Sequence, residues 1–158
     1  MRKEFAVAKV AIVMGSKSDS EVAGKAEAVL NEFGIEFETH VISAHRNPNR
    51  IKKFALSAEQ NGIGAVIAIA GLAAHLPGVV ASLTVIPVIG VPAAAGPLNG
   101  LDALYSIVQM PPGIPVASVG INNAKNAALL AAQILGTSDA DLRKKMKKFR
   151  EQFGDDAG

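Results

Sequence analysis

The segment VAIVMGSKSD, residues 10–19, decides the fold, because five apolar residues run directly into a polar turn. An apolar run of this length without alternation is typical of a strand that is buried on both faces. Behind the turn, apolar residues recur at helical spacing up to Phe33, and Gly34 supplies a stop. Ser18 or Asp19 is expected to cap this helix. The segment therefore predicts a strand, a polar turn and a helix, in that order.

Four further apolar segments predict the remaining strands of an α/β fold. Strands are expected over residues 35–42, 65–70, 88–91 and 116–119. Helices are expected over residues 48–61, after Pro77, over 101–108, from Asn122 or Asn123 to Gly136, and from Asp139 onward. The alternation in residues 35–42 is typical of a half-exposed edge strand, with His40 on its surface. Regular strand–helix alternation predicts a three-layer α-β-α fold with a parallel sheet and a C-terminal helix.

Three polar segments follow the first three expected strands, at residues 15–19, 43–48 and 71–78. Five parallel strands favour the flavodoxin-like order 2-1-3-4-5, in which those three strands are neighbours. Ligands bind outside the carboxyl ends of such strands, at the point where the order reverses. The three segments are therefore expected to converge on one binding site.

The first polar segment is suited to binding a phosphate group. Gly15 lets the backbone turn sharply, and Ser16 and Ser18 add hydroxyls beside the free N–H groups of a helix start. The alternative is that Ser18 or Asp19 only caps the helix. Because a carboxylate beside a phosphate would repel it, Asp19 is better placed on sugar hydroxyls.

The other two polar segments supply one arginine and two histidines. Arg46 offers paired donors to a phosphate, and the imidazole of His45 can exchange a proton near neutral pH. The alternative is that both are ordinary residues of a surface loop. His75 lies in an apolar loop. Its imidazole could be structural, with hydrogen bonds to backbone carbonyls, or it could be catalytic, and the residue types leave both roles open. A zinc site from the two histidines would have only Asp19 as a third ligand, so no metal is expected.

Length and composition indicate one domain that associates with copies of itself. The 158 residues fit a single domain, residues 1–158, with residues 137–158 as a C-terminal helical extension. Hydrophobic residues make up 49% and charged residues 19%, which leaves little polar surface and favours an oligomer. The apolar stretch 65–97 is interrupted by His75, prolines and glycines, which favours a buried core over a membrane span.

Charge and cysteine content exclude several kinds of partner and site. The net charge is only +2, and the basic run at residues 143–148 is expected to be a solvated helix face without a nucleic-acid-binding motif. The chain has no cysteine, which excludes disulfides, thiolate metal sites and cysteine nucleophiles. No targeting signal is readable at the N-terminus. We therefore expect a cytoplasmic protein with neither a nucleic-acid nor a membrane partner.

Six motifs together closely resemble the class I N5-carboxyaminoimidazole ribonucleotide mutases, the phosphoribosylaminoimidazole carboxylase catalytic subunit family. They are GSKSD at 15–19, SAHR at 43–46, AGLAAHLPG at 70–78, LNG at 98–100, SIVQMP at 106–111 and NAALLAAQIL at 126–135. The resemblance spans nearly the whole chain, and it implies that residues 1–158 form one nucleotide-binding catalytic domain. It implies a flavodoxin-like homo-octamer that acts in de novo purine (IMP) biosynthesis without a metal or organic cofactor. Leu72 and residues 93–97 depart from the family's usual sequence, which has a second glycine at position 72.

The resemblance also implies a role for each matching residue. Catalytic roles fall to His45, as the general acid and base, and to His75. Binding of the phosphoribosyl aminoimidazole nucleotide falls to Gly15, Ser16, Ser18, Asp19, Ser43, Ala44 and Arg46. Within that set Ser16, Ser18 and Arg46 meet the phosphate and Asp19 meets the ribose. The migrating carboxylate is held by Ala70, Gly71, Ala74, His75 and Leu76.

Two other functions compete with this interpretation. Aminoimidazole ribonucleotide carboxylases use free carbon dioxide and resemble Ser-Ala-His-Lys and Gly-Arg-Ser-Asn at two of these loops, whereas this chain has Arg46 and the Ala-Ala-His-Leu-Pro form. A non-enzymatic flavodoxin-like nucleotide-binding domain is the second alternative. A receiver domain needs acidic residues after the first and third strands, where this chain has Gly15-Ser16 and Ala70-Gly71. A flavin carrier favours aromatic rings, and Tyr105 is the only Tyr or Trp.

Overall fold

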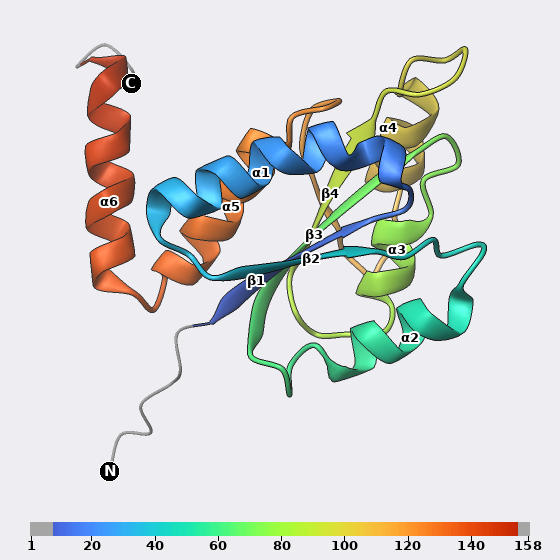
Figure 1. The fold of residues 1–158 in the computed structure, drawn as a ribbon, viewed down its shortest axis with the longest axis horizontal. Helices are drawn as coiled ribbons and strands as arrows, with labels where there is room; N and C mark the ends of the chain where they lie inside the picture. The colour runs from blue at the N-terminus through green and yellow to red at the C-terminus, as the bar shows by residue number, and fades with distance from the viewer. Residues whose placement is uncertain (1–7, 155–158) are drawn as a thin grey trace.

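A five-stranded parallel sheet lies between two layers of helices in the computed structural model, which describes residues 8–154 (Figure 1). The strands are β1 Lys9–Met14, β2 Phe37–Val41, β3 Ile63–Gly71, β4 Val88–Ala93 and β5 Ala117–Ser118. Their order is β2-β1-β3-β4-β5, and every neighbouring pair is parallel. The predicted α/β class and strand order are confirmed.

Within residues 8–154, six α-helices connect the strands or flank the sheet. They are α1 Ser20–Phe33, α2 Pro48–Ser57, α3 Leu76–Ala81, α4 Leu101–Val108, α5 Ala124–Gly136 and α6 Ala140–Arg150. Two short 3₁₀ turns are η1 Lys17–Asp19 and η2 Glu151–Phe153. Helices α1 and α5 pack on one face of the sheet, and α2, α3 and α4 pack on the other. No helix within the described residues 8–154 is long and apolar enough to span a bilayer.

The central strands β1 and β3 are buried on both faces, as their uninterrupted apolar sequences predict. Along β1, Val10, Ile12 and Met14 belong to the core under α1 and α5, while Ala11 and Val13 belong to the core under α2, α3 and α4. Each of these side chains is at most 3% exposed. Since successive strand residues point to opposite faces, an apolar run without alternation fills two cores at once.

The predicted element boundaries are correct in several places and wrong in others. Helix α4 spans the predicted residues, and α1 ends at Phe33 with Gly34 in the left-handed conformation, at a φ of +68°. Helix α2 ends at Ser57 rather than near residue 61, because the chain continues in hydrogen-bonded turns as far as Gly62. Strand β5 has two residues instead of four, since a proline without an N–H precedes Val116 and Gly120 begins a turn.

The C-terminal helix α6 packs against α5 and is tied to the end of α1 (Figure 1). Asp139 caps α6 by accepting hydrogen bonds from the N–H groups of Asp141 and Leu142. Lys145 donates a 2.7 Å hydrogen bond to the carbonyl oxygen of Phe33, an otherwise unpaired acceptor at the end of α1. The extension therefore stabilises the helical layer that covers one face of the sheet.

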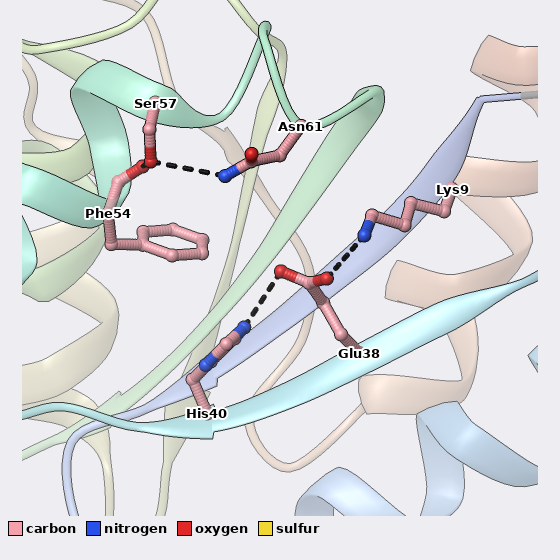
Figure 2. A network of polar contacts seen from close by, with 6 residues as sticks. All are labelled: Lys9, Glu38, His40, Phe54, Ser57 and Asn61. Atoms are coloured by element: carbon pink, nitrogen blue, oxygen red, sulfur yellow. Dashed lines mark hydrogen bonds and ion pairs between the residues drawn. The ribbon is translucent and has the colours of Figure 1, made fainter.

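His40 lies partly exposed on the edge strand β2, as predicted, and it also takes part in a polar network that the sequence did not indicate (Figure 2). The carboxylate of Glu38 lies between two partners: its Oε2 is 2.6 Å from Nζ of Lys9, and its Oε1 is 2.8 Å from Nε2 of His40. The ring of His40 packs on Phe54 of α2, with centroids 5.2 Å apart. Burial raises the pKa of Glu38, but hydrogen bonds from Lys9 and His40 more than reverse this, so its pKa is below the usual value. Charged groups on β2 also discourage another strand from pairing with this edge.

Candidate active site

A cavity of about 600 Å³ opens where the three polar segments converge, at the carboxyl ends of β1, β2 and β3. It is lined by Gly15, Ser16, Ser18, Asp19, Ser43, Ala44, His45, Arg46, Ala70, Gly71, Leu72, Ala73, Ala74, His75, Leu76 and Ala95. All thirteen residues singled out in the sequence are in this set. The predicted convergence is therefore observed, while the individual roles of these residues stay predictions.

Three lining residues, Leu72, Ala73 and Ala95, were missed by the sequence analysis. Leu72 and Ala73 lie inside the 71–78 segment, but their apolar side chains carry no chemical signal. Ala95 follows β4, which was expected to end at residue 91 and in fact ends at Ala93. Because β4 lies next to β3, its longer course brings the following loop to the cavity wall.

The first polar turn begins at Ser16. Its hydroxyl accepts a 3.3 Å hydrogen bond from the N–H of Ser18 and caps η1. Asp19, one of the two predicted candidates, does occupy the N-cap position of α1, but its side chain makes no capping hydrogen bond. A short 3₁₀ turn separates β1 from α1, and the hydroxyl of Ser16 caps that turn. The carboxylate of Asp19 is left available to a ligand.

Burial raises the pKa of the Asp19 carboxyl above its ordinary value, and a backbone hydrogen bond at Ser16 lowers it by less. Within residues 8–154, no cationic side chain forms an ion pair with this carboxylate. A partly buried carboxylate that has no cationic partner lowers the stability of the fold. A residue with a structural role only would not need such a charge, so charges of this kind are concentrated at functional sites. Its position therefore favours a role in binding.

We expect Asp19→Asn to raise the free energy of unfolding at pH 7, by less than about 1 kcal/mol since the carboxyl is only partly buried. A raised native pKa means that ionisation is harder in the folded protein than in the unfolded chain. The gain should shrink as the pH falls through the native pKa and vanish below the unfolded value of 3.8. Urea unfolding of the variant and the unchanged protein at pH 7 and pH 3 measures the difference in unfolding free energy at each pH. A less stable variant at pH 7 would contradict the electrostatic argument.

Arg46 places its positive charge beside the first turn. Its Nη2 donates to the carbonyl oxygen of Gly15 at 3.4 Å, and its backbone N–H donates to the hydroxyl of Ser43 at 3.2 Å. The guanidinium group is exposed and faces the same cavity as Ser16 and Ser18. Together these groups provide the charge and the donors that a phosphate group requires.

His45 and His75 form a direct pair in the cavity. Nε2 of His45 lies 2.7 Å from Nδ1 of His75, and the rings meet edge to face with centroids 4.8 Å apart. The ring of His75 thus hydrogen-bonds to a second imidazole rather than to the backbone carbonyls of the structural alternative. Because one nitrogen must offer a lone pair to the other, at least one of the two rings is neutral when this bond is made. The pair can hold and exchange one proton.

The other features of the described chain are less suited to catalysis. A second hollow, of about 770 Å³, is lined mostly by apolar residues of 55–56, 81–88 and 113–115, with the hydroxyls of Ser82 and Thr84, and Glu59 is its only titratable side chain. Within residues 8–154, no three His, Cys, Asp or Glu side chains are grouped closely enough to hold a metal ion. The cavity at the carboxyl ends of the strands is therefore the candidate active site.

Comparisons with known proteins connect this cavity to an enzyme family. A family model described as AIR carboxylase matches residues 9–156. The chain is 59% identical over 145 residues to the N5-carboxyaminoimidazole ribonucleotide mutase of Pyrococcus abyssi, which covers 92% of this chain and 83% of the relative. It is 56% identical to the mutase of Saccharolobus solfataricus, over 94% of both chains.

Two further similarities complete this picture. The phosphoribosylaminoimidazole carboxylase of Saccharomyces cerevisiae is 54% identical over 89% of this chain, which matches 24% of that protein's length. The crystal structure of Treponema denticola PurE superposes with a TM-score of 0.82 at 33% identity, covering 92% of this chain and 90% of that one.

Proposed function

Because this chain belongs to the AIR carboxylase family, we propose that it is an N5-carboxyaminoimidazole ribonucleotide mutase, an isomerase of purine biosynthesis. It converts N5-carboxyaminoimidazole ribonucleotide to 4-carboxyaminoimidazole ribonucleotide. The observation that carries this proposal is 54–59% identity to relatives of that name over 91% or more of the chain. The cavity with its paired histidines supports it.

The nucleotide is held at both ends of its ribose phosphate. The phosphate lies by the first turn, where Ser16 and Ser18 offer hydroxyls and N–H groups and Arg46 offers a guanidinium. Asp19 accepts hydrogen bonds from the ribose hydroxyls, which are about one sugar length from the phosphate. Ser43 and Ala44 line the route between this end and the histidines.

The reaction moves a carboxyl group from nitrogen to carbon with His45 as the proton carrier. His45 gives its proton to the carbamate nitrogen, the bond from that nitrogen to the carboxyl carbon breaks, and carbon dioxide is released within the cavity. C4 of aminoimidazole ribonucleotide then attacks carbon dioxide to form the new carbon–carbon bond. His45 takes the proton that C4 loses, so the ring regains its aromaticity and the enzyme its proton.

His75 supports this cycle through its hydrogen bond to His45. A ring nitrogen 2.7 Å from Nε2 of His45 can orient the imidazole and can accept or return its proton. The loop of Ala70, Gly71, Ala74 and Leu76 encloses the carboxylate end. Enclosure matters because escape of carbon dioxide would turn an intramolecular transfer into an inefficient bimolecular reaction.

A carboxylase that uses free carbon dioxide is the second candidate, since some relatives carry the name phosphoribosylaminoimidazole carboxylase. The two candidate functions differ in the source of the carboxyl group, which is the N5-carboxylate of the substrate for a mutase and free carbon dioxide for a carboxylase. We expect substrate labelled in its N5-carboxylate, in buffer with unlabelled bicarbonate, to give a product that keeps most of the label. Mass spectrometry of the product measures the retained fraction. Complete exchange with bicarbonate, or turnover only from aminoimidazole ribonucleotide and carbon dioxide, would replace the mutase by the carboxylase.

We further propose that the enzyme works as a cytoplasmic homo-octamer. An apolar stripe on α4 supports association: Leu101, Tyr105 and Val108 recur at helical spacing and are 44–58% exposed. Leu98, three residues before α4 begins, is also exposed. The absence of cysteine fits a reducing compartment. Light scattering of the purified protein measures the mass, and a stable monomer at micromolar concentration would overturn the assembly.

A further inference from the structure

Leu72 has a backbone conformation that leucine rarely adopts. Its φ is +55°, in the left-handed region where the Cβ atom crowds the following carbonyl oxygen. The other non-glycine residues of 8–154 with a positive φ are Asn99 and Asn122, whose side chains tolerate this region. A glycine at position 72 would adopt the same conformation without strain. The β3–α3 loop thus carries a strained residue where an unstrained one would fit.

Burial of the side chain does not explain this strain. Leu72 is 52% exposed, whereas the core residue Leu30 is fully buried. Leu72 therefore recovers only part of the hydrophobic stabilisation that a buried leucine provides. Strained residues that the core does not require are concentrated at functional sites. The contacts of the Leu72 side chain, and not its burial, must therefore account for the strained backbone at this position.

The side chain of Leu72 reaches across to the β4–α4 loop. A Cβ atom built on Gly96 would lie 2.8 Å from Cδ2 of Leu72, so the leucine packs directly on the Gly96 backbone. The preceding residue makes a parallel contact, since a Cβ atom on Gly71 would lie 3.1 Å from Cβ of Ala95. The two loops are therefore in contact along residues 71–72 and 95–96. Leu72 and residues 93–97 are also the two stretches that depart from the family's usual sequence, so a leucine at position 72 and this particular β4–α4 loop occur together in this chain.

This contact forms part of the cavity wall. Leu72 and Ala95 line the cavity together with Ala73, Ala74 and His75, the hydrogen-bond partner of His45. Carbon dioxide has no hydrogen-bond donor and no net charge, so an apolar wall retains it by closing exits rather than by binding it. A side chain that spans two loops closes the gap between them.

We propose that Leu72 is a positioning residue that ties the β3–α3 loop to the β4–α4 loop and so retains carbon dioxide between the two halves of the reaction. The inference rests on the proposed mutase function, in which breaking the nitrogen–carboxyl bond frees carbon dioxide and forming the C4–carboxyl bond consumes it. In this role Leu72 acts through the wall of the cavity and takes no part in binding the phosphate or in the proton transfer by His45. Its removal changes how often carbon dioxide escapes, and leaves nucleotide binding as it was.

The test measures label loss in variants at position 72. Leu72→Gly removes the side chain and the strain, Leu72→Ala removes the side chain alone, and Leu72→Met restores an apolar chain of similar length. Leu56→Ala is the matched control, because Leu56 lies on α2 away from this cavity and is similarly exposed, at 57%. Each enzyme receives carboxyl-labelled substrate in unlabelled bicarbonate, and retained label, kcat and KM are measured with the melting temperature.

We expect Leu72→Gly and Leu72→Ala to lose label to bicarbonate at least ~5-fold more often per turnover, with KM unchanged. Leu72→Met and Leu56→Ala should retain label as the unchanged enzyme does. Leu72→Gly should melt no lower than the unchanged protein, because glycine relieves the strain. A merely structural role would lower the melting temperature and leave label retention unaltered.

The outcomes separate this inference from the proposed function. Unchanged label retention in Leu72→Gly, alongside turnover and retention in the unchanged enzyme, would overturn the role of Leu72 alone. An unchanged enzyme that does not convert the substrate, or that loses all of its label, would overturn the mutase function and the role of Leu72 with it.

Discussion

Replacement of His45 by asparagine is expected to lower turnover at least ~10²-fold, the lower end for positioned acid–base catalysis. Asparagine keeps polarity and approximate size but cannot carry a proton near neutral pH. The phosphate turn and Asp19 are untouched, so the dissociation constant of the nucleotide should change little. A steady-state assay measures the loss in kcat, and isothermal titration calorimetry with aminoimidazole ribonucleotide measures the dissociation constant.

Arg46→Ala is the matched control for this variant, because Arg46 is adjacent in sequence and lines the same cavity. Loss of the guanidinium should weaken nucleotide binding first and leave turnover at saturating substrate much less affected. A His45→Asn enzyme with a nearly normal rate would remove His45 from the mechanism. Equal losses of binding in both variants would indicate that the change disturbs the loop rather than the chemistry.

Gly90→Ala is expected to destabilise the fold by about 2–3 kcal/mol, as overpacking of a core typically does. An added Cβ atom would lie 2.4 Å from Cγ2 of Ile107, 3.1 Å from Val116 and 3.3 Å from Pro77. Gly90 lies in β4, and Ile107 is a fully buried residue of α4. The helix would have to move away from the sheet. A fall in melting temperature of roughly 5–10 °C is the measurement.

Gly24→Ala is the contrasting substitution, since nothing lies within 4 Å of an added Cβ atom there. Gly24 is inside α1, where alanine has the higher helix propensity. We therefore expect a gain of about 0.5–1 kcal/mol, opposite in sign to the effect at Gly90. A tolerated Gly90→Ala, with an unchanged melting temperature, would show that α4 is not held against the sheet as closely as these contacts indicate.

The sequence by itself determined the order of the elements and the place of the site. The apolar runs of β1 and β3 signal strands covered on both faces, and the glycine and asparagine signals at Gly34 and Asn123 mark a helix end and a helix start. Those signals are local, because they depend on periodicity and on the conformational preferences of single residues. The parallel order then brings three loops to one edge of the sheet.

Only the tertiary structure decided how the groups at that edge meet. Residues 30 apart in sequence form the His45–His75 pair, and Asp19 stands at the start of α1 without using its side chain as a cap, while Ser16 caps the preceding η1. Likewise, Ala95 reaches the cavity because β4 continues to Ala93, and Leu72 is strained against Gly96. Such contacts depend on strand lengths and on the packing of one loop against another. No local pattern encodes them, since each residue's neighbour is supplied by a distant part of the chain.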